Sequence, residues 1–328
     1  MSTPDVAIIH DAARNFFRNH PGHTFRVEIF RFLKLLIINP ELRPPPAIIN
    51  LIDSTFKGLK SGSRPVRSLE GSGGVYLMRN ARDNKYVSVF KPIDEEPKGL
   101  KKGTELGGGA VREVAAYILD RGFSGIPPTV MVELNKKVGS LQKYVDNDGS
   151  CENFGPAGFP VSAVHRLAVL DIRLANVDRH AGNILVRKDG DKIVDLVPID
   201  HGYCFPDTFE DCTFEWLYWP QAREAFSNDV AEYVNKLDVE KDIEQLRRNG
   251  WNIPPACARV LRVATMLLKK GVKRGMTAYG IGKAMCRQTA ERLSVVENIV
   301  LEVDCSDEAD FVDSVSKVMD RYLETISP

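Results

Sequence analysis

The stretch VDRHAGNILV, residues 177–186, limits most strongly what this chain can fold into and do. It contains Asp178 and Asn183, and the later run VPID ends on Asp200. Carboxylate and amide oxygens of this kind are the ligands that a hard cation such as Mg²⁺ takes. Alternatively, one carboxylate orients a hydroxyl group while the other two side chains hold the cation. The rest of the chain decides which of these two interpretations applies.

The segment ILVRKDGDKIVDLVPID predicts a β-hairpin, because two runs of apolar and β-branched residues flank the turn signal Asp189-Gly190. Asp178 and Asn183 precede this hairpin, and Asp200 follows it. A hairpin brings its two ends together, so we expect all three oxygen-bearing side chains in one site.

The bulk properties are those of a globular protein long enough for two lobes or two small domains. The chain has 328 residues and a formal net charge of zero, which gives no reason to expect a nucleic-acid partner. Its 6 cysteines lack zinc-site spacing and are expected to be free thiols in a reducing compartment. No apolar run approaches the roughly 20 residues of a membrane span, and no signal-peptide pattern opens the chain. We therefore expect a cytoplasmic protein, peripheral to membranes at most.

The first part of the chain predicts a helical extension followed by a small sheet. Apolar residues at helical spacing indicate helix over most of residues 6–60, so residues 1–60 form the predicted N-terminal extension. Residues 61–150 form the predicted small lobe. There EGSGGVYLMR and KYVSVFKPI predict a hairpin, AVREVAAYILDRGF a helix, and PPTVMVEL and KVGSLQKYV two further strands. The apolar repeat of the extension runs through Phe25, Ile29, Phe32, Leu33 and Leu36.

The second part predicts a larger, mainly helical lobe over residues 151–328. A loop rich in glycine and proline, residues 146–160, indicates the crossing between lobes. Helical patterns follow in SAVHRLAVLDIRLA and in residues 221–248, 255–274, 277–293 and 307–325. The predicted fold is α+β: a two-lobed, protein-kinase-like fold with a sheet-plus-helix N-lobe and a mainly helical C-lobe.

The small lobe offers the parts of an ATP-phosphate clamp. Four residues, Gly71, Ser72, Gly73 and Gly74, open its first strand, and glycines let backbone N–H groups approach phosphate oxygens. Lys91 closes the next strand, where kinases place the lysine that contacts the α- and β-phosphates. Glu113, on the helix that follows, is the expected partner of Lys91, and Glu95 and Glu96 compete for that pairing.

The large lobe offers the parts that act on the transferred phosphate. Asp178 and Asn183 match the D-x-x-x-x-N spacing of the kinase catalytic loop, so Asp178 is expected to orient the acceptor hydroxyl and take its proton. Asn183 and Asp200 are expected to bind Mg²⁺ through oxygen. In this order along the chain, these parts predict a phosphotransferase that uses ATP and Mg²⁺.

Several of these segments resemble a known family. DRHAGNILV resembles the D-R-H-x-x-N loop of phosphoinositide 3- and 4-kinases. The stretches VFKPIDEEP, REVAAYILD, VPIDHGYCFP and FEWLYWPQA are similar to type II phosphatidylinositol 4-kinases, above all to the plant gamma class. The resemblance implies transfer of the ATP γ-phosphate to the 4-hydroxyl of phosphatidylinositol, with Lys91 as the ATP lysine. It also adds His180 to the catalytic residues, because an imidazole can exchange protons near neutral pH.

Two departures from the family keep alternatives open. The animal enzymes carry a cysteine-rich palmitoylation insert in the small lobe, whereas no cysteine lies between Lys91 and Glu113. Residues 1–60 also lack the pattern of the ubiquitin-like domain that the gamma class often carries. The acceptor is therefore phosphatidylinositol or a protein serine or threonine hydroxyl. A catalytically inactive binding module is a third alternative, although every polar residue that catalysis requires is present.

Two surface features have competing interpretations. FPDTFEDCTFEWLYWP, residues 205–220, is rich in aromatic residues that either pack on the large lobe or insert into a lipid interface, and we expect packing. The basic run KKGVKRG, residues 269–275, is either a solvated helix end or a site for an anionic headgroup, and we expect the former.

Overall fold

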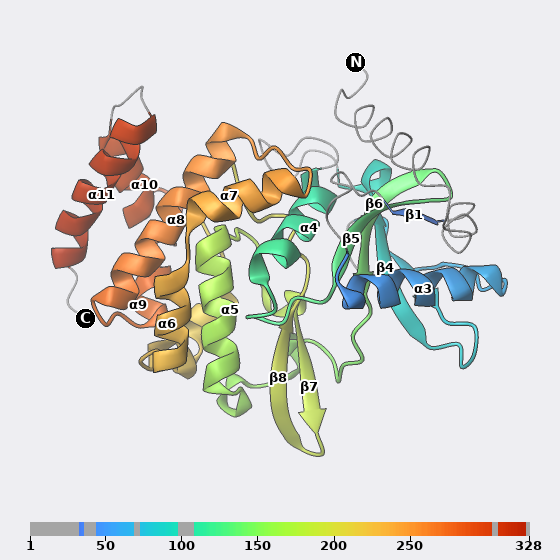
Figure 1. Cartoon of the computed structure of the whole chain (residues 1–328). Helices are drawn as coiled ribbons and strands as arrows, with labels where there is room; N and C mark the ends of the chain where they lie inside the picture. Colours follow the sequence, from blue (N-terminus) through green and yellow to red (C-terminus); the bar gives the residue numbers. More distant parts are fainter. Residues whose placement is uncertain (1–32, 36–43, 69–72, 98–107, 304–307, 326–328) are drawn as a thin grey trace. The chain divides into compact units, whose positions relative to one another are not determined.

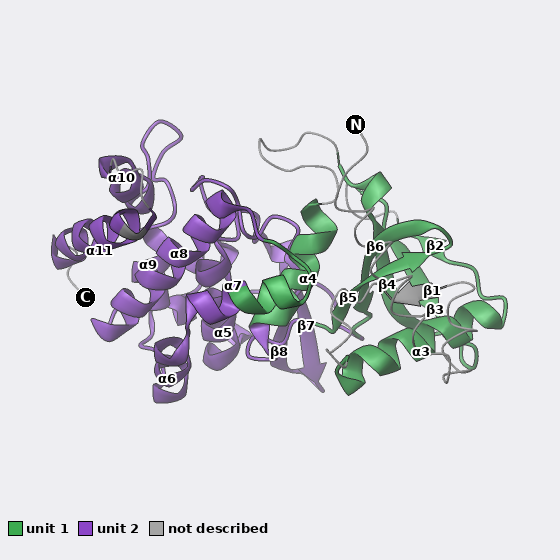
Figure 2. Cartoon of the chain, turned by 45° about the horizontal axis from the view of Figure 1, so that its top comes forward, with its two compact units in different colours: residues 1–119, 127–145, 244–252 green, residues 120–126, 146–243, 253–328 purple. Residues whose placement is uncertain are grey.

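A computed structural model describes residues 33–35, 44–68, 73–97, 108–303 and 308–325 (Figure 1). The chain divides into two compact units (Figure 2). Unit 1 comprises residues 1–119, 127–145 and 244–252, and unit 2 comprises residues 120–126, 146–243 and 253–328. Each unit has a hydrophobic core of its own.

Unit 1 is built on a six-stranded sheet with the order β1-β5-β6-β4-β3-β2, in which neighbouring strands are antiparallel. β3 and β4 form the first predicted hairpin, and Asn84 in its turn adopts a left-handed φ of 60°, which asparagine tolerates better than most residues. β5 and β6 match the two other predicted strands and pair with each other. The strands are β1 (Leu33–Leu35), β2 (Val66–Arg67), β3 (Tyr76–Arg79), β4 (Tyr86–Pro92), β5 (Thr129–Leu134) and β6 (Lys137–Lys143).

Two helices accompany this sheet. α3 (Pro46–Lys60) begins with a proline, whose missing N–H would have no partner in a first helical turn. Its apolar face forms one core with residues of the sheet; the members are Ile48, Leu51, Ile52, Phe56, Met78, Phe90, Val132, Leu134 and Leu141. α4 (Gly108–Asp120) is the predicted helix that carries Glu113. The residue spacing therefore predicted both the sheet and the helix that follows Lys91.

The prediction of helix across residues 6–60 is wrong at residues 33–35. β1 pairs there with β5, and Leu33 lies opposite Leu134. The main-chain groups of an edge strand attract a further strand, and this non-local pairing outweighs a local helical repeat. The other residues of the apolar repeat, Phe25, Ile29, Phe32 and Leu36, lie outside the described residues.

Unit 2 is mainly helical around the long, largely buried helix α5 (Val161–Leu174). β7 (Ile184–Asp189) and β8 (Lys192–Pro198) form the second predicted hairpin, with Gly190 at φ 60° in the turn. α8 (Pro255–Lys273) packs against α5. The other helices are α6 (Asn228–Lys236), α7 (Val239–Arg248, whose residues 244–248 belong to unit 1), α9 (Ala278–Lys283), α10 (Val295–Glu302) and α11 (Glu308–Thr325).

Two predicted helices differ from the sequence pattern: the one over residues 221–248 is divided into α6 and α7 at residues 237–238, and the one over residues 277–293 is shorter. Residues 220–223 form a 3₁₀ turn, η6 (Pro220–Arg223), before α6 begins at Asn228. α9 ends at Lys283, although the pattern predicted helix to residue 293. Beyond that point the backbone N–H of Arg287 donates to Asp211 Oδ1 across 2.8 Å, and its guanidinium pairs with Glu297. These tertiary contacts hold the segment away from α9 before α10 begins.

The aromatic segment packs into unit 2, as predicted. Phe205, Phe214, Trp216 and Trp219 are each at most 4% exposed. Trp216 lies on the 3₁₀ turn η5 (Glu215–Tyr218) and stacks on Phe214 with ring centroids 4.9 Å apart. Tyr218 is the exception, with 82% of its surface exposed.

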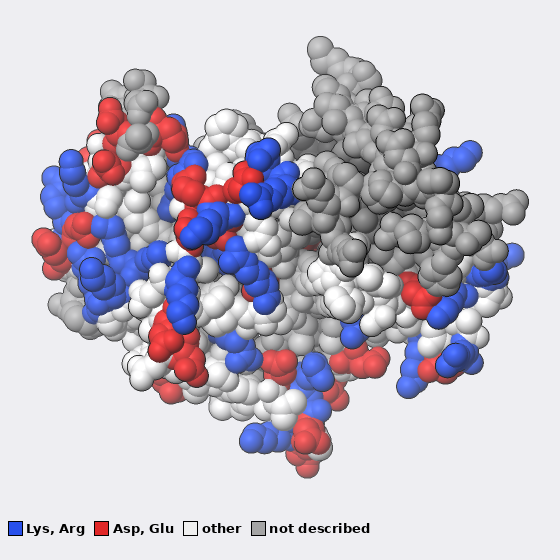
Figure 3. All heavy atoms as spheres, in the orientation of Figure 1, with Lys and Arg blue, Asp and Glu red and all other residues white. Residues whose placement is uncertain are grey.

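The basic run at the end of α8 is a surface feature with partners. Lys270 and Arg274 pair with Asp320 of α11 at 2.5 and 2.8 Å, and Lys269 donates to the carbonyl oxygen of Leu237. In Figure 3, positive and negative side chains intermingle on this face. The run is therefore a helix end whose charges are partly neutralised within unit 2.

The described cysteines are free thiols, as predicted: Cys151, Cys204, Cys212, Cys257 and Cys286. Cys305 lies outside the described residues. Among the helices that the structure describes, none combines the length and the apolar character needed to cross a bilayer.

Candidate active site

Unit 1 holds the candidate phosphate-contacting residue in an ion pair. Lys91 on β4 lies 2.5 Å from Glu113 on α4. The Glu113 side chain is 3% exposed and that of Lys91 is 23% exposed. The carboxylate is thus the buried member, and it holds an ammonium group that retains some access to solvent.

Glu95 and Glu96, the competing carboxylates, have other partners. Glu95 accepts a hydrogen bond of 2.9 Å from the Tyr76 hydroxyl and pairs with Lys137. Glu96 accepts from the backbone N–H of Ala110 across 2.7 Å, at the start of α4. A carboxylate at a helix N-terminus accepts a hydrogen bond from an otherwise unpaired N–H group and interacts favourably with the helix dipole. The pairing that sequence spacing left open is therefore the one between Lys91 and Glu113.

The contacts of Glu95 shift two pKa values. Hydrogen bonds from Lys137 and then from Tyr76 lower the pKa of Glu95. The hydrogen bond to Glu95 raises the pKa of the Tyr76 hydroxyl, because removal of the proton would leave two negative charges side by side.

The glycine-rich turn lies against the same carboxylate. The Gly74 N–H donates to the Glu95 carbonyl oxygen across 3.0 Å, and a Cβ atom at Gly74 would lie 2.2 Å from Glu95 Oε2. Gly74 is therefore required for this close approach, and its amide is already engaged. Gly73 is described too, whereas Gly71 and Ser72 lie outside the described residues.

Unit 2 holds the candidate catalytic residues in the loop between α5 and β7. α5 ends at Leu174, and the C-cap residue Ala175 adopts a left-handed φ of 47°. Asn176 follows, and its Oδ1 accepts the backbone N–H of Asp178 across 3.1 Å. Asn183 is 8% exposed and donates from Nδ2 to the Asp178 carbonyl oxygen across 3.1 Å. The two ends of the D-x-x-x-x-N motif are thus tied together within the loop.

The hairpin brings Asn183 next to the residue before Asp200, as the turn signal predicted. Ile184 pairs with Pro198 at the open end of the hairpin, and the Ile199 N–H donates to the Asn183 carbonyl oxygen across 3.0 Å. Asp200 comes next, with a left-handed φ of 56°. Such a backbone conformation is uncommon in a residue other than glycine, although aspartate adopts it more readily than most residues, and it often marks a turn or a functional site.

His180 lies on the exposed side of the loop. Its Nδ1 accepts the backbone N–H of Gly182 across 3.1 Å, at the start of the 3₁₀ turn η4 (Ala181–Asn183). A ring nitrogen that accepts carries no proton, so the neutral imidazole here has its N–H at Nε2.

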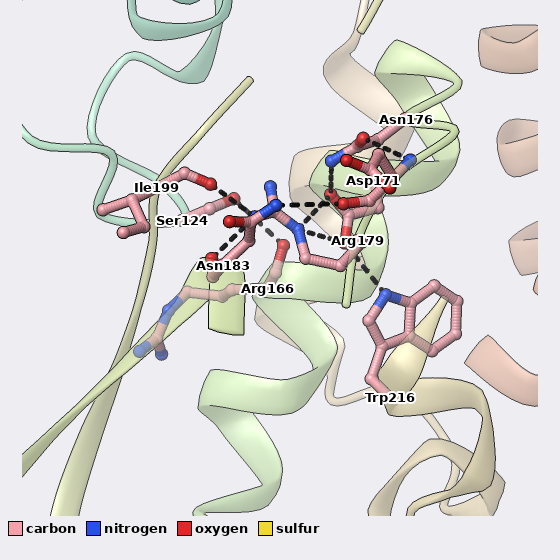
Figure 4. Close-up of polar contacts among 9 residues, drawn as sticks. Ser124, Arg166, Asp171, Asn176, Arg179, Asn183, Ile199 and Trp216 are labelled. Carbon is pink, nitrogen blue, oxygen red and sulfur yellow. Dashed lines mark hydrogen bonds and ion pairs between the residues drawn. The ribbon is translucent and has the colours of Figure 1, made fainter. Parts of the chain in front are cut away.

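Three buried residues of the site were not predicted from sequence. Asp171 on α5 and Arg179 in the loop form an ion pair at 3.0 Å with both side chains fully buried. Trp216 donates from Nε1 to Asp171 Oδ2 across 3.0 Å. Figure 4 shows the Arg179 guanidinium between Asp171 on one side and Asn183 and Ile199 on the other. One signal was available: Asp171 is a charged residue inside the apolar helix sequence AVLDIRL.

These features define a class. A small antiparallel sheet carries a lysine paired with a helix glutamate, and a mainly helical unit carries a D-x-x-x-x-N loop, a hairpin and an aspartate after it. This is the arrangement of a kinase-like fold. A family model described as phosphatidylinositol 3- and 4-kinase matches residues 75–281, and the chain belongs to that family.

Curated relatives agree with the family. The chain is 50% identical over 343 residues to phosphatidylinositol 4-kinase gamma 3 of Arabidopsis thaliana, an alignment that covers 89% of this chain and 60% of that protein. It is 50% identical over 329 residues to phosphatidylinositol 4-kinase gamma 4 of Oryza sativa subsp. japonica, with 89% of this chain and 58% of that protein covered. The chain thus spans about three-fifths of the length of these relatives. The resemblance seen in the sequence is confirmed.

Proposed function

We infer that this chain is an ATP-dependent kinase that transfers the γ-phosphate of ATP to the 4-hydroxyl of phosphatidylinositol. Membership of the family and the names of the curated relatives support this acceptor. The structural observation that carries the proposal is the loop and hairpin of unit 2, which bring Asp178, Asn183 and Asp200 together.

Each side chain has a role that its position supports. Asp178 orients the 4-hydroxyl and takes its proton as the new O–P bond forms and the bond from the γ-phosphorus to the β-phosphate oxygen breaks, releasing ADP. Lys91, held by Glu113, contacts the α- and β-phosphates. His180 is a second proton carrier through its Nε2, since its Nδ1 is engaged by Gly182.

The donor set fits Mg²⁺. Asn183 donates through Nδ2 to the Asp178 carbonyl oxygen, so its Oδ1 is the atom left to act as a ligand. Asp200 adds a carboxylate. Mg²⁺ usually takes one or two protein oxygens and completes its coordination with water and phosphate oxygens. When bound, the ion supplies positive charge against the phosphate oxygens.

The test is an assay with two acceptors in one mixture. The purified chain is incubated with labelled ATP, Mg²⁺, phosphatidylinositol in detergent micelles and a mixed protein extract. We expect label in the lipid, at the 4-position by chromatography against 3- and 4-phosphate standards, and no label when Asp200→Ala replaces the wild type. Label in protein hydroxyls alone would replace the lipid acceptor with a protein one, and label in neither fraction would contradict the proposal.

A further inference from the structure

We propose that the buried Asp171–Arg179 ion pair is a positioning device that holds Asp178, Asn183 and the backbone before Asp200 in one arrangement. This inference rests on the proposed function and extends it to two residues that act through others.

Asp171 is the residue at which the hydrogen bonds of this positioning device meet. Its carboxylate is fully buried and accepts from Arg179 Nε at 3.0 Å, from Asn176 Nδ2 at 3.0 Å and from Trp216 Nε1 at 3.0 Å. A buried carboxylate is tolerated only when charge and hydrogen bonds compensate it. These three donors come from two separate segments, residues 176–179 and η5, so Asp171 fixes both segments against α5 (Figure 4).

A first set of hydrogen bonds connects Asp171 through Asn176 to Asp178. Because a carboxylate can only accept, Asn176 must turn its Nδ2 toward Asp171. Its Oδ1 is then the atom that accepts the Asp178 N–H across 3.1 Å. The buried Asn176 amide therefore fixes the backbone of Asp178 relative to Asp171. Asp178 is the residue proposed to orient the acceptor hydroxyl.

A second set of contacts runs from Asp171 through Arg179 to Asn183 and to the residue before Asp200. Asn183 and Asp200 are the two proposed metal ligands. Arg179 Nη1 donates to the Asn183 carbonyl oxygen at 2.7 Å and to the Ile199 carbonyl oxygen at 2.6 Å. One nitrogen therefore joins the two ends of the hairpin, next to the strained φ of 56° at Asp200. A strained residue keeps its conformation only when its surroundings over-determine it, and the bond to Ile199 supplies such a restraint.

A second buried ion pair in unit 2 provides the comparison. Arg173, also on α5, lies 2.6 Å from Asp242 on α7, and both side chains are at most 2% exposed. Arg173 Nη1 also donates to the Tyr233 hydroxyl across 3.3 Å. The two arginines are six positions apart in sequence and equally buried, so a purely structural role predicts similar effects when either is changed.

The test compares Arg179→Lys with Arg173→Lys in the full chain. Lysine keeps the charge but cannot reach a carboxylate and two carbonyl oxygens together. We expect both variants to lower Tm, and only Arg179→Lys to lower kcat, by about 10²-fold, the scale of a misplacement of about 1 Å. The KM for ATP should stay within about threefold. Amide hydrogen exchange at Asp178 and Ile199 should quicken about tenfold in Arg179→Lys alone.

The outcomes separate this inference from the proposed function. If the wild type phosphorylates no acceptor, the proposed function fails, and the exchange data alone decide whether the pair holds the loop. Equal effects of the two variants on kcat and on exchange would overturn the inference. Should Arg179→Lys fail to fold, Asn176→Ala replaces it, because it keeps the Asp171–Arg179 ion pair and removes the two hydrogen bonds that join Asp171 to the backbone of Asp178. We then expect a kcat at least about tenfold lower, and a wild-type kcat would overturn the inference.

Discussion

Glu113 holds Lys91 from the buried side: the two side chains meet at 2.5 Å, and the carboxylate is 3% exposed while the lysine is 23% exposed. A charge-assisted hydrogen bond of this kind fixes the direction of the ammonium group. The Lys91 side chain is therefore held in few rotamers, as its proposed contact with a phosphate requires.

Glu113→Gln tests this relationship. The substitution keeps the shape of the side chain and removes its charge, at a cost of about 1.5–3 kcal/mol for a hydrogen bond to a charged group. We expect kcat/KM for ATP to fall about 10- to 100-fold, and further in Lys91→Ala. Glu96→Gln is the matched control: it weakens the cap of α4 and should lower Tm while leaving kcat/KM within about threefold. Wild-type kcat/KM in Glu113→Gln would assign the clamp to another pair.

Asp200→Ala tests the metal-ligand assignment. Loss of the carboxylate should lower kcat by at least about 10³-fold, because metal binding stabilises the transition state by several kcal/mol. Raising Mg²⁺ should not restore it. Asp195→Ala, on β8 of the same hairpin, removes a half-buried carboxylate that pairs with Arg166 at 3.4 Å and should leave kcat unchanged. Normal turnover of Asp200→Ala at ordinary Mg²⁺ would remove Asp200 from the site.

His180 has two possible roles, which substitution can separate. Asparagine can present its Oδ1 to the Gly182 N–H much as Nδ1 does, whereas alanine cannot. If the imidazole carries a proton, His180→Asn and His180→Ala should both lose about 10²-fold in kcat, and only His180→Ala should lose thermal stability. We expect this result. A His180→Asn variant with wild-type kcat would reduce the histidine to a cap of the loop.

Local signals predicted the elements of the site, but not all of their partners. Asp189-Gly190 is a short-range turn signal, so the hairpin that joins Asn183 to Asp200 could be derived from sequence. Glu113 was the expected partner of Lys91, but spacing along the chain could not exclude Glu95 and Glu96, because it does not show which carboxylate faces the ammonium group. Tertiary contacts decide it: Glu95 faces Tyr76 and Lys137, which leaves Glu113.

The features that were missed or wrong are non-local. The role of Asp171 depends on Arg179 and Trp216, which belong to later segments. Periodicity records only that Asp171 is a charged residue in an apolar helix, and not what compensates its charge. The strand at residues 33–35 depends likewise on an edge that β5 supplies about a hundred residues later. The sequence pattern alone cannot predict either the contacts of Asp171 or the pairing of β1 with β5.

The Tyr76–Glu95 contact predicts how stability depends on pH. The pKa of Glu95 is lowered in the folded chain from its ordinary 4.5, so its contribution is present above that pH and lost as pH falls through the folded pKa. The pKa of Tyr76 is raised from 10.0, so its contribution is lost only as pH rises through the higher value. The difference in unfolding free energy between wild type and Tyr76→Phe should therefore be constant near neutrality and shrink toward pH 3.

Tyr86→Phe is the control for that measurement. Tyr86 lies on the neighbouring strand β4, and its hydroxyl accepts from Arg79 Nη2 across 3.1 Å. No carboxylate takes part in that hydrogen bond, so the difference between wild type and Tyr86→Phe should not change between neutral pH and pH 3. Urea unfolding at each pH gives both differences. If the difference in unfolding free energy between wild type and Tyr76→Phe grew on acidification, the Tyr76 hydroxyl would instead stabilise the protonated Glu95 carboxyl.

The last prediction concerns the bilayer. Stable attachment needs two signals, and in the aromatic segment Tyr218 is 82% exposed while Trp216 and Trp219 are buried. In the basic run, Lys270 and Arg274 are paired with Asp320. We therefore expect the chain to co-sediment poorly with neutral vesicles and to phosphorylate phosphatidylinositol faster in detergent micelles. The control is Leu301→Ala, which changes a comparably exposed apolar residue. Tyr218 would instead be a membrane anchor if the wild type bound neutral vesicles regardless of salt, Tyr218→Ala abolished this binding and Leu301→Ala left it intact.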